Sequence, residues 1–302
     1  MHEGELALEP GVAAQLIARR FPELRGVPLR PVSTTGTVNR IIRVGDALVA
    51  RFPIVGASVD ELVREAAALD EFAASSPFPA PRSYGTASAS EEFDSAWAVQ
   101  TWIEGDVADP ERSATSEQLA HDLVALISAL RCVDVRGRVF DGRGRGGSLG
   151  DHDEWVATCL MRSEHLVDTA RAARLWAALR ELPSADTAVM SHRDLTPFNL
   201  LIAEHEGATR LAGVLDGGDF GPADPALDLV AAWHLFDAPV RRIIRAGVCP
   251  DDAEWHRGAA WALQQALGLG WYYARSNPAM SALGISTVER VLADAELSAL
   301  VD

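Results

Sequence analysis

Residues 191–199 carry the pattern in this chain that most strongly suggests chemistry. They read S-H-R-D-L-T-P-F-N, so Asp194 follows His-Arg and Asn199 comes five positions later. This spacing is typical of a kinase catalytic loop, in which the aspartate orients the attacking hydroxyl and the asparagine binds magnesium. The alternative is a chance match, because a lone His-Arg-Asp triplet is a weak signal.

A second acidic motif strengthens this interpretation. The segments 200–204 and 210–216 predict a β-hairpin that ends in V-L-D-G-G-D, with Asp216 at a strand end. Phosphoryl transfer needs an orienting carboxylate and oxygen ligands for Mg²⁺, and little other help. We therefore predict a magnesium-dependent phosphotransferase in which Asp194 is catalytic and Asn199 and Asp216 bind the metal. The alternative for Asp216 is that it only opens a turn.

The basic residues are unusual for such an enzyme, because all 27 are arginine. Kinases use a strand lysine to hold the phosphates of ATP. We predict that Arg51, in the predicted strand 47–53, replaces this lysine and pairs with Glu65 in the following helix, since a guanidinium suits phosphate oxygens. The alternative is two surface charges. The next candidates for phosphate binding are then Arg40 and Arg43.

The elements that must position these residues fall into two groups. The first third of the chain is rich in strands, predicted at 29–34, 39–45, 47–53 and 96–103, and contains two predicted helices, 9–20 and 58–75. After Glu104-Gly105 the pattern becomes helical around the hairpin already described: 115–131, 152–181, 225–236, 239–246, 252–275 and 286–298. A strand-rich lobe followed by a helical lobe predicts an α+β, bilobal fold with a cleft at the junction.

Composition excludes some classes of function. The formal charge of −16 argues against nucleic-acid binding, which needs a basic surface. Acidic residues gather between positions 186 and 237, and they favour either solubility or a cationic substrate. They are Asp186, Asp194, Glu204, Glu206, Asp216, Asp219, Asp224, Asp228 and Asp237. Three scattered cysteines, no signal-peptide pattern and no apolar run of membrane-spanning length predict a cytoplasmic protein without a membrane partner.

Over nearly its whole length the chain resembles the aminoglycoside phosphotransferase family, which includes macrolide kinases and other small-molecule kinases of the protein-kinase-like fold. The similarity runs from T-T-G-T-V-N-R-I-I-R-V-G-D (34–46) through H-R-D-L-T-P-F-N to G-V-L-D-G-G-D-F-G-P-A-D-P-A-L-D-L-V-A-A-W (213–233). It implies a small antiparallel-sheet N-lobe with one key helix and a larger, mainly helical C-lobe. Residues 1–103 would bind the nucleotide, and residues 104–302 would carry catalysis and the acceptor.

The resemblance also implies roles for individual residues. Asp228 would brace the catalytic loop, and Arg51 and Glu65 would serve the nucleotide phosphates. The loop over the phosphates would comprise Ser33, Thr34, Thr35, Gly36, Thr37 and Asn39, and the hinge against adenine Gln100, Thr101, Trp102 and Ile103. The chain departs from the family at Arg193, where glycine is frequent, and at Gly217, where tryptophan is frequent.

The reaction so implied uses ATP or GTP with Mg²⁺ to phosphorylate a hydroxyl of a small molecule. Acidic residues favour a cationic, aminoglycoside-type antibiotic as acceptor, and hence antibiotic resistance. A macrolide kinase, which needs an apolar wall from helices 225–236 and 261–273, and a metabolic or biosynthetic alcohol kinase are alternatives. An alternative of another class is a nucleotide-binding protein without kinase activity. A protein kinase is disfavoured, because only Gly217–Gly221 separate Asp216 from the next proline-rich segment.

Several other patterns receive structural interpretations. Residues 141–148 contain G-x-G-x-x-G but follow no clear strand, so we predict a mobile loop in the helical lobe and no dinucleotide site. The histidines lack metal-binding spacing, and we expect His192 to shape the catalytic loop. The aromatic residues Trp233, Trp261, Trp271, Tyr272 and Tyr273 are expected in the core, with a ligand-binding wall as the alternative.

Overall fold

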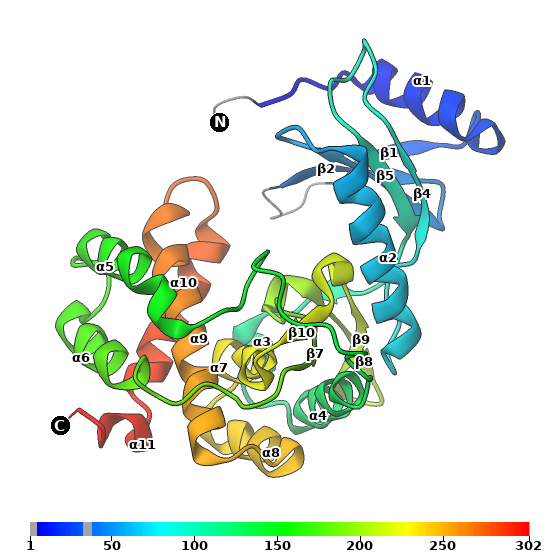
Figure 1. Cartoon of the computed structure of the whole chain (residues 1–302). Coiled ribbons are helices and arrows are strands. Elements are labelled where there is room, and N and C mark those ends of the chain that lie inside the picture. The colour runs from blue at the N-terminus through cyan, green and yellow to red at the C-terminus, as the bar shows by residue number, and fades with distance from the viewer. Residues whose placement is uncertain (1–4, 33–37, 302) are drawn as a thin grey trace. The chain divides into compact units, whose positions relative to one another are not determined.

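The computed structural model describes residues 5–32 and 38–301, which form two compact units (Figure 1). The first unit comprises Met1–Ala74, Pro79–Glu104 and Leu215–Asp219, and the second comprises Ser75–Phe78, Gly105–Val214 and Phe220–Asp302. Asp216 therefore belongs to the first unit, whereas Asp194 and Asn199 belong to the second.

The first unit is built on a five-stranded antiparallel sheet with the strand order β1-β2-β3-β5-β4. Its strands are β1 Leu29–Val32, β2 Asn39–Val44, β3 Leu48–Pro53, β4 Ser83–Ala87 and β5 Trp97–Thr101. Its helices are α1 Pro10–Arg20 and α2 Val59–Ser75. The predicted turn at Gly45-Asp46 joins β2 to β3, which pair along their full length.

One face of this sheet forms an apolar core with α1. Leu16 and Ile17 of α1 are buried in the same cluster as Ala50 and Phe52 of β3, and Phe52 stacks on Trp97 of β5 at 4.8 Å between ring centroids. Because strand side chains alternate between faces, Arg51 points away from this core.

Helix α2 begins with the predicted cap. Ser58 Oγ accepts a hydrogen bond from the backbone N–H of Glu61 at 3.2 Å, and the Glu61 carboxylate accepts one from the backbone N–H of Ser58 at 2.8 Å. This reciprocal pair is a capping box. The buried positions of the helix are Leu62, Leu69 and Phe72.

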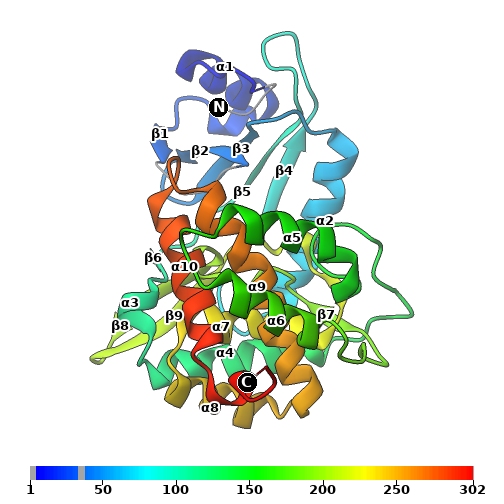
Figure 2. The same ribbon diagram turned by 90° about the vertical axis from the view of Figure 1, so that its left-hand side faces the viewer.

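The second unit is mainly helical, and among the described helices none is long and apolar enough to cross a membrane. The helices are α3 Pro110–Ser113, α4 Glu117–Arg131, α5 Asp153–Arg162, α6 Thr169–Leu179, α7 Val230–Leu235, α8 Ala238–Val248, α9 Asp252–Tyr272, α10 Pro278–Leu292 and α11 Ala295–Ser298. The long helices α9 and α10 pack side by side (Figure 2). Trp233 of α7 and Trp261 of α9 are almost fully buried, which confirms that they belong to the core. Trp271 is only partly buried and Tyr272 is 48% exposed at the end of α9, so the core prediction was wrong for Tyr272.

Two small sheets in this unit frame the candidate catalytic loop. One pairs β7 Val189–Ser191 with β10 Gly221–Ala223, and the other has the order β6-β8-β9. The latter strands are β6 Asp106–Val107, β8 Leu200–His205 and β9 Ala208–Val214. Residues 192–199 connect β7 to β8, so both ends of the loop are fixed by strand pairing.

The structure corrects two predicted helices. The predicted helix 152–181 is two helices, because the Asp168 carboxylate caps a new start by accepting a hydrogen bond from Arg171 N. The predicted helix 286–298 begins earlier, at Pro278 after the Asn277 cap, and ends at Leu292 before a second short helix. Both errors arise because apolar periodicity does not register caps between consecutive helices.

Candidate active site

The candidate catalytic loop is held together by contacts among its own residues. The Asn199 side-chain amide donates to the backbone carbonyl of Asp194 at 2.9 Å, and Thr196 N donates to the same oxygen at 2.8 Å. The backbone N–H of Asp194 donates to His192 Nδ1 at 3.3 Å, and His192 is fully buried. His192 therefore shapes the loop, as expected.

Asp228 braces this loop from the short 3₁₀ segment Pro225–Leu229. Its buried carboxylate accepts hydrogen bonds from Ser191 Oγ at 2.8 Å and from the backbone N–H groups of His192 and Arg193, both at 3.1 Å. Hydrogen bonds to a buried carboxylate are strong and leave the loop few alternative conformations. The bracing role implied by the family resemblance is confirmed by these contacts.

Arg193 adopts a left-handed backbone conformation, with φ of 71°. A non-glycine residue is strained there, which explains why glycine is frequent at this position in the family. The side chain is held from several sides: its guanidinium donates to Pro222 O at 3.1 Å and to Arg143 O at 3.2 Å, and it lies 5.1 Å from the centre of the Phe140 ring. Arg193 thus attaches the catalytic loop to residues 140–143.

The Asp194 carboxylate forms an ion pair with Arg145. The two side chains are 27% and 42% exposed, respectively, so the pair is partly accessible to solvent. Arg145 lies in the glycine-rich loop that sequence analysis set aside, and it was not predicted as a site residue. The sequence feature that could have drawn attention to Arg145 is its position between glycines in a strongly acidic chain.

In the first unit, Arg51 forms its ion pair with Asp216. The distance from Arg51 Nη2 to Asp216 Oδ1 is 3.0 Å, and Arg51 Nη1 donates to Gln100 Oε1 at 3.4 Å. Arg51 is the more buried partner, with 20% of its side chain exposed compared with 49% for Asp216. The strand arginine and the metal-binding candidate are therefore in direct contact.

The predicted ion pair between Arg51 and Glu65 is absent from the described residues, and this prediction was wrong. Glu65 is exposed and lies outside the buried stripe of α2, so it does not require a partner as a core carboxylate would. The surrounding protein still desolvates the Glu65 carboxyl and raises its pKa, while the nearby Arg51 charge opposes the rise and Asp216 and Asp219 add to it. Arg51 and Glu65 therefore influence each other electrostatically at a distance and form no ion pair.

The turn after β9 explains why position 217 is glycine, where the family resemblance leads us to expect tryptophan. Asp216 has φ of 61°, a left-handed conformation for a non-glycine residue. A Cβ on Gly217 would lie 2.5 Å from the Phe72 ring of α2, closer than atoms can approach. Phe72 thus fills the space that a side chain at position 217 would need.

The remaining nucleotide-site candidates lie along β2 and β5. Asn39 opens β2 opposite Pro53, and Gln100 and Thr101 close β5. Trp102 then donates its backbone N–H to Ala47 O at 2.8 Å, and Ile103 follows. Arg43, an alternative phosphate holder, lies 4.5 Å from the centre of the Trp102 ring and pairs with Glu104. The predicted phosphate loop residues Ser33, Thr34, Thr35, Gly36 and Thr37 lie outside the described residues.

The oxygen donors present fit magnesium. Because Asn199 uses its amide nitrogen toward the Asp194 carbonyl, its side-chain oxygen remains the acceptor available to a cation. Asp216 adds a carboxylate at the end of β9. Mg²⁺ in phosphotransferases is held by one or two such groups together with substrate phosphates and water. No group of three or more His, Cys, Asp or Glu side chains suited to a metal occurs among the described residues.

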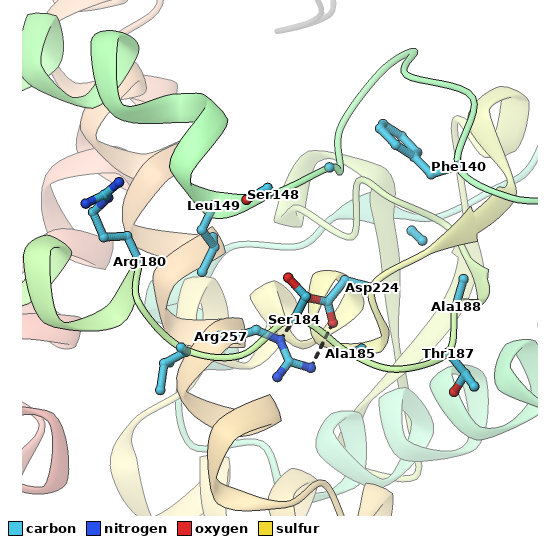
Figure 3. Close-up of a pocket in the computed structure, with 13 residues that line it drawn as sticks. Phe140, Ser148, Leu149, Arg180, Ser184, Ala185, Thr187, Ala188, Asp224 and Arg257 are labelled. Atoms are coloured by element: carbon cyan, nitrogen blue, oxygen red, sulfur yellow. Dashed lines mark hydrogen bonds and ion pairs between the residues drawn. The ribbon is translucent and has the colours of Figure 1, made fainter.

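A cavity of about 160 Å³ lies in the second unit beside residues 140–148 (Figure 3). Phe140, Gly147 and Ser148 line one side of it. On another side Arg257 binds the Asp224 carboxylate through two contacts of 2.8 and 3.1 Å. Asp194 is not among the residues that line the cavity.

Three of the nine acidic residues clustered in the sequence, among them both candidate site aspartates, pair closely with arginine. Asp194 pairs with Arg145 and Asp224 with Arg257 in the second unit, and Asp216 pairs with Arg51 in the first. These arginines come from distant parts of the sequence, so counting charges within 186–237 overestimated the negative charge near the candidate residues.

Comparison with known proteins places these observations in a family. A sequence profile of the phosphotransferase enzyme family matches residues 29–261. The viomycin phosphotransferase of Streptomyces vinaceus is 37% identical over 102 residues, which is 32% of this chain and 35% of that protein. The matched segment thus spans about a third of the length of this relative.

Two solved structures cover almost the whole chain. An aminoglycoside phosphotransferase in complex with GDP and kanamycin matches with a TM-score of 0.71 at 17% identity, covering 94% of this chain and 99% of that one. A macrolide 2'-phosphotransferase of type I matches with a TM-score of 0.61 at 20% identity, covering 93% and 98%, respectively. These likenesses confirm the expected α+β, protein-kinase-like fold.

Proposed function

The chain belongs to the phosphotransferase enzyme family, and on this premise we propose that it transfers the terminal phosphate of ATP or GTP to a hydroxyl of a cationic small molecule. The proposed acceptor is an aminoglycoside or another polycationic antibiotic. The single observation that carries the proposal is the braced loop, in which Asp228 and Asn199 fix the backbone around Asp194 through hydrogen bonds of 2.8 to 3.1 Å.

Within this proposal, Asp194 orients the acceptor hydroxyl and accepts its proton as the phosphoryl group is transferred. Such reactions rely on positioning and electrostatic stabilisation, so a carboxylate on a rigid loop is the main requirement on the acceptor side. The left-handed Arg193 and the buried Asp228 support this role, because they hold the backbone that carries Asp194.

On the nucleotide side, we assign phosphate binding to Arg51, with the loop 33–39 over the phosphates and residues 100–103 against the base. Residues 1–103 then form the nucleotide-binding lobe, and residues 104–302 the catalytic and acceptor-binding lobe. Asn199 and Asp216 supply oxygen ligands to Mg²⁺. When bound, magnesium neutralises charge on the phosphates during transfer. Asp216 also keeps Arg51 in place through their 3.0 Å ion pair.

A cationic acceptor is favoured over an apolar one. The relatives named above include a viomycin phosphotransferase and a kinase solved with kanamycin, beside one macrolide phosphotransferase. The apolar wall that a macrolide would require is only partly available, because Trp233 and Trp261 are 0% and 1% exposed whereas Tyr272 is 48% exposed. Phosphorylating such an antibiotic in the cytoplasm, where ATP and GTP are abundant, would make the protein a resistance enzyme.

The test is a phosphate-transfer screen with radiolabelled ATP and GTP in the presence of Mg²⁺. Kanamycin, viomycin, a macrolide and a simple amino alcohol serve as acceptors. We expect phosphorylated product with kanamycin or viomycin, and none with the Asp194→Asn variant. Nucleotide binding without transfer to any acceptor would contradict the proposal and support a binding protein without kinase activity. Transfer to the amino alcohol alone would indicate a metabolic kinase.

A further inference from the structure

We infer that Arg145 determines acceptor specificity: it occupies the Asp194 carboxylate until a cationic group of the acceptor replaces it. The inference rests on the proposed function, because it assumes that Asp194 orients the acceptor hydroxyl. Its starting observation is the ion pair between Arg145 and Asp194 within the second unit. A carboxylate engaged by a guanidinium has fewer lone pairs and less space for a hydroxyl.

The loop that carries Arg145 is held by side chains. Within the described chain, residues 139–147 make no backbone–backbone hydrogen bond. Arg193 donates to Arg143 O at 3.2 Å, and His152 Nε2 lies 3.2 Å from Gly146 O. These contacts fix the backbone on either side of Arg145, while the Arg145 side chain itself remains 42% exposed.

The loop also borders a cavity. Phe140 and Gly147, near its two ends, both line this cavity (Figure 3). Gly144 and Gly146, which flank Arg145, both have positive φ, of 65° and 141°. Arg145 can therefore leave Asp194 without breaking a strand, a helix or an apolar core, which is the property of segments that open locally.

The charge of the acceptor determines whether it can replace Arg145 at the Asp194 carboxylate. The Asp194 side chain is only 27% exposed, so separating it from its guanidinium leaves a carboxylate with limited access to water. An acceptor that carries an ammonium group beside its hydroxyl restores the lost charge interaction. A neutral acceptor or a water molecule does not. Arg145 thus favours cationic acceptors and suppresses transfer of phosphate to water.

The experiment compares the wild-type protein with Arg145→Ala. Acceptors are kanamycin and its fully N-acetylated derivative, which keeps the hydroxyls but loses the ammonium charges. We expect wild type to prefer kanamycin in kcat/KM, and Arg145→Ala to reduce this preference by about tenfold, as when a charge-dependent contribution is removed. Hydrolysis of the nucleotide without acceptor should rise by a similar factor, about tenfold.

Arg143→Ala is the matched control. Arg143 lies two residues away in the same loop, its side chain is exposed, and it forms no ion pair within the described chain. We expect its acceptor preference and its nucleotide hydrolysis to equal those of wild type. Arg145→Ala behaving like this control would overturn the inference. Equal loss of transfer to both acceptors would also overturn it, because Arg145 would then act in the transfer step itself.

A second measurement does not depend on turnover. Cleavage within residues 140–147 by subtilisin should accelerate in both Arg145→Ala and Asp194→Asn, because each variant removes the ion pair that holds the loop. Unchanged cleavage in both would overturn the inference even if the protein proved inactive. Absence of transfer by the wild-type protein, with accelerated cleavage in the variants, would instead reject the proposed function and leave the ion pair with a structural role in the loop.

Discussion

The two candidate aspartates Asp216 and Asp194 each pair with an arginine, and the backbone that carries the arginine differs greatly between the two pairs. Arg51 lies in the middle of β3, which is paired on both sides by β2 and β5, and it holds Asp216 at 3.0 Å. Arg145 lies in a glycine-rich loop without backbone–backbone hydrogen bonds in the described chain, and it holds Asp194. The first arginine is a fixed part of its site, and the second is replaceable.

We propose that this difference divides two tasks of phosphoryl transfer between the pairs: nucleotide binding for Arg51 and acceptor selection for Arg145. Every reaction cycle uses a nucleotide with the same phosphates, so a rigid strand is a suitable support for the cation that binds them. The acceptor hydroxyl must instead gain access to Asp194. A cation that pairs with Asp194 must therefore be able to dissociate from it. An arginine on a loop can do so at a low cost in free energy.

The largest effect is expected at the aspartate of the loop pair. Asp194→Asn should reduce kcat by about 10²- to 10⁴-fold, because the variant keeps the shape of the side chain but cannot accept the proton of the hydroxyl. Nucleotide affinity should stay within a factor of about two of wild type, since no binding contact is removed. Steady-state kinetics and calorimetry measure the two quantities. Near-normal turnover would remove Asp194 from the catalytic role.

The next effect concerns the strand arginine. Arg51→Ala should weaken nucleotide binding by about tenfold to a hundredfold, the loss expected for charged hydrogen bonds to phosphate. Arg51→Lys should lose less, because it keeps the charge but not the planar fork. Adding Glu65→Gln to Arg51→Ala should restore little thermal stability, since Glu65 is exposed and is not the direct partner of Arg51. Unchanged affinity in Arg51→Ala would shift the role to Arg40 or Arg43.

A third prediction tests the turn that presents Asp216 to Arg51. Gly217→Ala places a methyl group where Phe72 lies and should destabilise the protein by about 2 kcal/mol through overpacking. Gly218→Ala is the control, because its Cβ would be 3.4 Å from the nearest atom, an ordinary contact. Denaturant unfolding compares the two variants. Equal stabilities would show that Phe72 does not fill the space at position 217.

The smallest effect is expected for the pH dependence of stability that His234 of α7 causes. Burial lowers the pKa of this histidine to about 3, and the nearby charges of Arg145 and Arg290 contribute to the decrease. Because the unfolded chain binds the proton near pH 6.5 and the folded chain does not, stability should fall as pH decreases from 6.5 toward 3.

At pH 5.5 this loss should be about 1 kcal/mol relative to pH 7. His234→Gln should remove it, whereas His205→Gln, at an exposed position, should leave it unchanged. The difference in unfolding free energy between the two pH values is the quantity to measure. A wild-type protein whose stability is equal at both pH values would contradict a buried neutral His234.

Sequence patterns were sufficient for the fold class and for four of the five strands of the first unit, with β4 missed. They placed Arg51 in a strand, and the helix predicted over 58–75 is α2, which Ser58 caps. These features depend on local periodicity and capping, which a single sequence records. Helix ends inside 152–181 were missed because Asp168 acts as a cap only in its three-dimensional context.

The ion-pair partners could not be predicted in the same way. Arg51 and Asp216 are 165 positions apart, and Arg145 and Asp194 are 49 positions apart. A carboxylate with several arginines available is paired by tertiary geometry, which spacing along the chain does not encode. The glycine-rich loop was set aside because its G-x-G-x-x-G pattern follows no clear strand, although its arginine contacts the candidate catalytic carboxylate.

The division of roles between the two arginines is the central claim, and one titration tests it most directly. Calorimetric binding of ATP and GTP with Mg²⁺ should be measured for wild type, Arg51→Ala and Arg145→Ala under the same conditions. The account predicts nucleotide affinity at least about tenfold weaker in Arg51→Ala and within a factor of about two of wild type in Arg145→Ala. Equal weakening in both variants would contradict it, because the loop arginine would then bind the nucleotide as the strand arginine does.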